Sequence, residues 1–205
     1  MRIPTWIIAA MGIALATAAL ADDGNPTAGK AKAEAAGCFA CHGADGIATQ
    51  NGLALSKFVP NLAAQPNLYL QFQLVYFRNG VRKNELMGAM AQSLSDEDVR
   101  NLAAYFASLP PPKLPLPADP APQQTALGER IATAVRCTNC HGDHYEGVDN
   151  IARLAGQNEV YLDEALHDFK SGKRKQIGPA GMGDVAYSLG DADMQALAHY
   201  LSRLR

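Results

Sequence analysis

The chain repeats itself on the two sides of a proline-rich segment, and this repeat limits its fold more than any other feature. Seven of the twelve prolines fall within residues 110–122, PPPKLPLPADPAP. Proline fixes φ and lacks an amide donor, so this stretch predicts an extended, semi-rigid linker rather than a helix or a central strand. We therefore expect two homologous domains, residues 22–109 and 123–205, joined by a linker at 110–122.

Equivalent residues recur at matched places in the two halves. The pairs include Gly29 with Gly128, Tyr69 with Tyr161, Arg82 with Arg174, and Met87 with Met182. The position of Met90 is taken by Val185 in the second half. Phe77-Arg78-Asn79-Gly80 likewise answers Phe169-Lys170-Ser171-Gly172. Domains this small bury little of their own surface, so each would gain stability from an internal cofactor.

Each domain is predicted to be all-α. Pro26 stands just ahead of an Ala- and Lys-rich helix expected at 27–36, which leads into a cysteine pair. Residues 66–79 predict a largely buried helix, and Ser95-Asp96-Glu97-Asp98 resembles a capping box that starts a last helix ending near Leu109. Runs of Val, Ile and Thr that would favour a sheet are missing.

The first 21 residues are typical of a signal peptide. Arg2 is the only charge before Asp22, the stretch 6–20 is apolar, and Ala19-Leu20-Ala21 resembles a cleavage site. An uncleaved anchor is the alternative, because 18 uncharged residues at 4–21 approach the lower limit for a spanning helix. The expected product is a soluble periplasmic protein. A formal charge of −2 without a long basic run argues against nucleic-acid binding.

All four cysteines lie in two copies of Cys-x-x-Cys-His: Cys38-Phe39-Ala40-Cys41-His42 and Cys137-Thr138-Asn139-Cys140-His141. Two thiols three residues apart project from the same side of a helical turn, so they can form thioethers to both vinyl groups on one porphyrin edge. The following His can then reach the iron. Two such copies, at matched places in an exported repeat, predict two covalently attached haem c groups.

Three other interpretations of the cysteines are weaker. A zinc site needs four converging ligands, and each motif offers only three. A thioredoxin-like redox pair needs an α/β context, which is missing here. Two short-range disulfides would leave the His after each pair unexplained.

A methionine is expected opposite each His, because a soft thioether favours ferrous iron and raises the potential of an electron carrier. Beyond the signal peptide the chain has Met87, Met90, Met182 and Met194. The repeat pairs Met87 with Met182, which makes these the predicted ligands, in loops kept open by neighbouring glycines. Met194 is expected in helical core. The alternative, in which Met90 is the ligand and Met87 is core, remains open.

Other polar residues give weaker signals. Arg82 and Arg174 could neutralise haem propionates or could sit at solvated helix ends. Tyr69 and Tyr161 could line the haem edge, although a buried aromatic role is favoured. Surface or core positions are expected for His144, His167 and His199, and a basic patch for Lys170, Lys173, Arg174 and Lys175.

At this point the chain resembles the dihaem cytochromes c of the c4 type, which are tandem class I cytochrome c domains. The similarity rests on the two Cys-x-x-Cys-His motifs, on 59–63 (VPNLA) and 154–157 (LAGQ), and on the Met-x-x-x-Ala-x-x-Leu segments. The resemblance implies paired domains with neighbouring haems. It also implies that the Pro60 carbonyl holds the His42 ring, with Ala152 standing where the second domain would have its Pro.

Electron transfer is the function that these features predict. The first hypothesis is a periplasmic carrier that passes single electrons to a terminal oxidase or similar acceptor, with peripheral membrane association left open. The second is a haem subunit of a periplasmic dehydrogenase. The third, a dihaem enzyme, would need an open iron, and the matched pair Met87 and Met182 argues against it.

Overall fold

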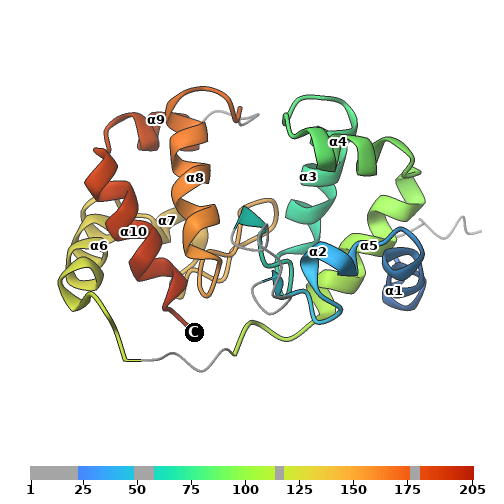
Figure 1. Cartoon of the computed structure of the whole chain (residues 1–205), viewed down its shortest axis with the longest axis horizontal. Coiled ribbons are helices and arrows are strands. Elements are labelled where there is room, and N and C mark those ends of the chain that lie inside the picture. Colours follow the sequence, from blue (N-terminus) through green and yellow to red (C-terminus); the bar gives the residue numbers. More distant parts are fainter. Residues whose placement is uncertain (1–22, 49–57, 114–117, 176–180) are drawn as a thin grey trace, which may run out of the picture.

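Helices in two lobes make up the computed structural model (Figure 1). The structure describes residues 23–48, 58–113, 118–175 and 181–205. Within those residues every regular element is a helix, which confirms the predicted all-α class. The expected signal peptide, 1–21, lies outside the described residues. No helix in the described ranges combines the length and the apolar character needed to cross a bilayer.

The helices follow the same order in both lobes. The first lobe has α1 (Pro26–Ala35), α2 (Phe39–His42), α3 (Asn67–Arg78), α4 (Glu85–Gln92) and α5 (Asp96–Ser108). The second has α6 (Pro122–Ala134), α7 (Thr138–His141), α8 (Glu159–Lys170), α9 (Met182–Tyr187) and α10 (Asp191–Ser202). Helix α6 thus begins at the last residue of the expected linker.

Local sequence explains where these helices begin. The side chain of Asn25 accepts hydrogen bonds from the amides of Thr27 and Ala28, and Pro26 then occupies the first turn of α1. Ser95 and Asp98 form a reciprocal capping box at the start of α5, as the sequence predicted. Three acidic residues in that first turn complement the helix dipole.

In each lobe the first helix packs closely against the last, α1 on α5 and α6 on α10. A glycine lies at each crossing. A Cβ on Gly29 would stand 1.9 Å from the carbonyl oxygen of Asn101, and one on Gly128 would stand 2.2 Å from that of Ala196. The repeated glycine therefore allows two helix backbones to touch.

Replacing Gly29 with Ala should destabilise the first lobe by about 3 kcal/mol or more, because the added methyl forces two backbones apart. Chemical denaturation followed by circular dichroism measures this loss. Gly88→Ala in α4 is the control, since its Cβ would meet only the Phe77 carbonyl oxygen, at 3.9 Å. Equal stability of the two variants would contradict the close-contact explanation.

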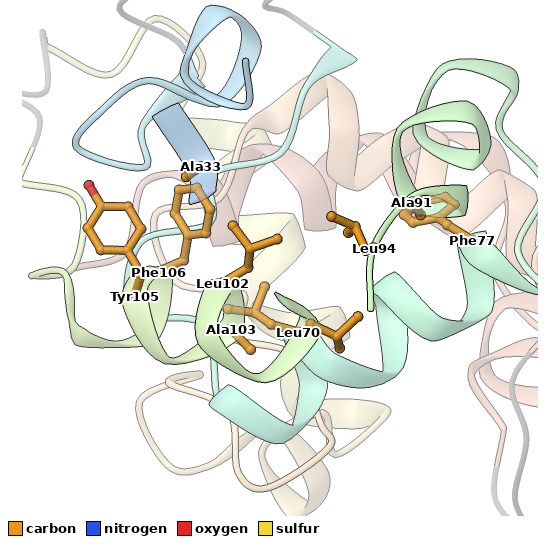
Figure 2. Close-up of a cluster of buried hydrophobic side chains, with 10 residues drawn as sticks. Ala33, Leu70, Phe77, Ala91, Leu94, Leu102, Ala103, Tyr105 and Phe106 are labelled. Carbon is orange, nitrogen blue, oxygen red and sulfur yellow. The ribbon is translucent and has the colours of Figure 1, made fainter. Parts of the chain in front are cut away.

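The core of the first lobe lies where α1, α3 and α5 meet (Figure 2). Its buried side chains include Leu70, Leu94, Leu102 and Phe106. The second lobe has an equivalent core, in which Met194 is 0% exposed. That position confirms Met194 as helical core rather than a ligand candidate.

Candidate haem-binding sites

The two Cys-x-x-Cys-His motifs adopt the same local conformation. The first cysteine of each motif donates its amide to the carbonyl of an alanine at the end of the preceding helix, Cys38 to Ala33 at 2.9 Å and Cys137 to Ala132 at 3.0 Å. Each motif then forms a single helical turn, α2 or α7, ended by a glycine with positive φ. None of the four cysteines forms a disulfide. The two thiols of each motif thus remain available for thioethers.

A backbone carbonyl orients each histidine. His42 Nδ1 lies 3.1 Å from the Pro60 carbonyl oxygen, and His141 Nδ1 lies 2.8 Å from that of Ala152. A carbonyl can only accept, so Nδ1 carries the proton and Nε2 keeps a lone pair. The expectation for Pro60 is confirmed, and Ala152 supplies the same contact without a proline.

Both histidines are 7% exposed. Burial lowers the pKa of His42 and His141, although the bonded carbonyl acts in the opposite direction. A neutral imidazole is the form that binds iron. These buried and oriented rings are therefore suited to be axial ligands.

A cavity of about 410 Å³ opens beside the first motif. This volume falls within the range of cofactor sites, roughly 300–1,000 Å³. The cavity is lined by Cys38, Cys41, His42, Met87 and Met90, with apolar side chains such as Leu70, Phe77 and Phe106. Thiols, imidazole and thioether around one apolar cavity fit a covalently attached haem.

The structure changes one expectation about the methionines. They were predicted in loops, but Met87 lies in α4 and Met182 is the first residue of α9. Asn84 explains why Met87 lies in a helix, because the Asn84 side chain accepts a hydrogen bond from the Met87 amide at 2.9 Å and caps α4. Both methionines pack against the core of their own lobe. In the described residues, no three His, Cys, Asp or Glu side chains gather as a metal cluster.

Residues from both lobes meet in a cluster of two arginines, two tyrosines and a glutamine between α3 and α8. Arg82 and Arg174 face each other as an isolated antiparallel bridge. Tyr161 Oη accepts from Arg82 at 3.0 Å and from Arg174 at 3.3 Å. Tyr69 accepts from Arg174 at 3.0 Å, and Gln73 accepts from both guanidiniums, at 2.7 and 3.1 Å. The solvated-terminus interpretation of both arginines is therefore wrong.

This cluster concentrates positive charge at the interface. Burial by itself would raise the pKa of Tyr161, but the charges and hydrogen bonds of Arg82 and Arg174 outweigh it and lower that pKa to about 7. Each guanidinium also lies over a phenylalanine ring of its own lobe, 4.5 Å from Phe77 and 4.6 Å from Phe169. All four Arg and Tyr residues border the first cavity. Anionic groups of a bound cofactor would be favoured here.

A second contact joins the lobes through backbone groups. Gln157 accepts the Asn61 amide at 2.6 Å and donates to the Asn61 carbonyl at 2.9 Å. Gln65 makes the matching pair with Arg153, at 3.0 and 2.9 Å. Each glutamine thus binds the other repeat at the equivalent position. Comparison of the two halves of the sequence identified Gln65 and Gln157 only as matching residues of the repeat. Their role at the lobe interface was missed.

Replacing Gln157 with Ala should weaken the lobe interface, because it leaves the buried amide and carbonyl of Asn61 without these partners. Each lost partner costs about 1–3 kcal/mol when the group stays buried. Thermal unfolding measures the effect, with exposed Gln124→Ala as the control. An unchanged midpoint for Gln157→Ala would show that the interface does not depend on this contact.

The remaining histidines and basic residues serve other roles. His199 is 4% exposed and lies between Asp119 of the linker, at 3.0 Å, and Glu159, at 3.1 Å. Hydrogen bonds from Thr125 and Ala121 lower the pKa of Asp119 to about 2, so it stays charged. The expected basic patch is largely engaged within the chain: Lys173 pairs with Asp168 at 3.0 Å, Lys170 donates to the Leu189 carbonyl, and Arg174 joins the interface cluster.

Comparison with known proteins assigns the class. The cytochrome c family model matches residues 26–110 and 125–205. The chain belongs to the cytochrome c family, and that family implies covalently bound haem c. The two tandem regions of this chain that the family model matches also confirm the resemblance to the dihaem c4 type.

Individual relatives narrow the class further. The chain is 35% identical to cytochrome c4 of Pseudomonas aeruginosa, over 88% of this chain and 89% of that one. It is 37% identical to the thiosulfate dehydrogenase electron acceptor of Thiomonas intermedia, over 82% of this chain and 79% of that one. The crystal structure of reduced cytochrome c4 from Pseudomonas stutzeri matches with a TM-score of 0.76 at 30% identity, over 89% of this chain and all of that one. Cytochromes c4 are electron carriers, not enzymes, which agrees with the predicted function.

Proposed function

We propose that this chain is a periplasmic dihaem cytochrome that passes single electrons between redox proteins. Each haem would be attached through two thioethers, to Cys38 and Cys41 in the first domain and to Cys137 and Cys140 in the second. The iron would be held by His42 and Met87 in one domain and by His141 and Met182 in the other. The observation that carries this proposal is the repeated arrangement of a thiol pair followed by a carbonyl-bound, buried imidazole.

Bound haem supplies an iron that alternates between ferric and ferrous states, so each domain could hold one electron. The protein's own residues would keep that iron closed. The Pro60 and Ala152 carbonyls orient the two histidine rings, and the largely apolar wall of the first cavity would limit the access of water. Low water access and a thioether ligand both favour the ferrous state.

The interface cluster supports electron exchange between the domains. Arg82 and Arg174 border the first cavity, and in the hydrogen bonds given above they donate to phenol and amide oxygens rather than to carboxylates. Haem propionates would supply carboxylate acceptors for these two guanidiniums. We therefore assign these arginines to the propionates, at the place where the two domains meet.

Two classes of redox partner suit this carrier. The first is a membrane oxidase or reductase, as the resemblance to the c4 type implies. The second is a periplasmic dehydrogenase, and the similarity to a thiosulfate dehydrogenase electron acceptor favours an enzyme of that kind as donor. Rapid mixing of the oxidised protein with thiosulfate dehydrogenase and thiosulfate tests the second class, because fast reduction requires a productive complex.

An optical spectrum with a denaturing haem count tests the core of the proposal. We expect two thioether-linked haems per chain and a weak far-red band of Met-ligated ferric iron at two-site intensity. A missing or half-strength band would show an open or differently ligated iron. The mass of the mature chain tests export, since cleavage before Asp22 removes the predicted signal peptide.

A further inference from the structure

Helix α4 brings two thioethers to the same cavity. Met87 and Met90 are three residues apart, a spacing that places side chains on one face of a helix. Both side chains line the cavity that also contains Cys38 and His42. Both are half-buried. The first cavity therefore contains two methionine sulfurs, although the proposed haem iron needs only one of them as a ligand.

The helix that carries them is held firmly at both ends. Asn84 caps its first turn through the Met87 amide, and Ala91, near its end, is 0% exposed in the core. Methionine side chains, in contrast, are unbranched and turn about three bonds. An exchange between the two sulfurs would therefore need rotation of side chains, without displacement of α4.

The second domain lacks this duplication. Val185 occupies the position that matches Met90, and valine offers no donor atom. Met194 is fully buried inside α10. Of the two methionines in the described part of the second domain, Met182 is thus the one that is not fully buried.

Two lysines also line the first cavity and could compete. A lysine must lose its proton before it can bind a metal. For Lys173, the hydrogen bond and charge of Asp168 raise the pKa and oppose that loss. Lys83 would yield a nitrogen-bound iron, which spectroscopy separates from a sulfur-bound one.

We infer that Met90 is a reserve axial ligand for the first haem, able to bind the iron when Met87 does not. This inference rests on the proposed function, in which Met87 is the resident ligand. It makes the two haems unequal: the first stays closed after loss of its methionine, and the second opens.

Nuclear magnetic resonance of the reduced dihaem protein, labelled with carbon-13 at the methionine methyl groups, tests the inference. Each iron-bound methionine gives its own upfield methyl resonance, so the unchanged protein should show two. Met87→Ala should keep two, with one displaced, whereas Met182→Ala should keep one. Met87→Ala combined with Met90→Ala should also keep only one. A single resonance in Met87→Ala alone would overturn the inference, and so would an iron closed by nitrogen.

Met90→Ala alone separates this inference from the proposed function. It should retain both resonances at unchanged positions, because Met87 remains bound. Loss of one resonance there, with both kept in Met87→Ala, would make Met90 the resident ligand, and the assignment of Met87 would fail.

A second experiment, in which a methionine is added to the second domain, tests the inference even if Met87→Ala does not accumulate with both haems. Val185→Met added to Met182→Ala should restore the second resonance, because it copies the Met90 position into the second domain. A protein that still shows one resonance would place this helical position out of reach of the iron and would overturn the inference.

Discussion

Replacing Cys137 and Cys140 together with Ser will lower the haem content from two groups per chain to one. Serine hydroxyls do not form the thioethers that attach haem c, and His141 alone would hold the group only by an exchangeable bond. The first domain keeps its own motif and its own core of α1, α3 and α5. A pyridine haemochrome assay per chain and the mass of the intact protein measure the change.

The matched variant, Cys38→Ser with Cys41→Ser, should also leave one haem, now in the second domain. Cys137→Ser by itself should retain two haems with an absorption band shifted to longer wavelength, because one vinyl group stays unsaturated. A double serine variant of Cys137 and Cys140 that still carried two haems after denaturation would rule out thioether attachment at this motif.

Replacing Met182 with Ala will leave both haems attached but open the second iron to carbon monoxide. The proposed thioethers at Cys137 and Cys140 and the His141 contact with the Ala152 carbonyl are untouched by this change. We expect one carbon monoxide to bind per reduced chain, against none for the unchanged protein, together with loss of one site's share of the far-red band. Optical titration of the reduced protein measures both.

Met194→Leu is the control for a general loosening of the second domain, since Met194 is a buried core residue of α10. It should bind no carbon monoxide. His141→Ala should be more disruptive than Met182→Ala, because the oriented imidazole is the stronger ligand. If Met182→Ala failed to bind carbon monoxide, another residue would be the second iron's ligand.

Several elements followed from short stretches of sequence. The helices expected at 27–36 and 66–79 appear as Pro26–Ala35 and Asn67–Arg78. The capping box at Ser95 and Asp98 starts α5 as expected. These features depend on neighbouring residues, on proline geometry and on side chains that cap nearby amides, so local sequence is sufficient to predict them.

The environment of the methionines was harder to predict. Neighbouring glycines suggested loops, but both methionines lie at or near the start of a helix, and Asn84 caps the first of these. The sequence also could not predict that Met90 lines the same cavity as Met87, because helical spacing does not say which face of a helix lines a cavity.

The sequence by itself determined the repeat, the all-α class, the two Cys-x-x-Cys-His motifs and the core position of Met194, because each depends on residues close together or on a comparison of the two halves. Tertiary structure alone decided how the halves meet. Gln157 binds Asn61, and Tyr161 receives Arg82 and Arg174 together, across separations of up to 96 residues. Such contacts arise when two folded surfaces pack, and no local pattern encodes which buried polar group will find its partner on the other domain.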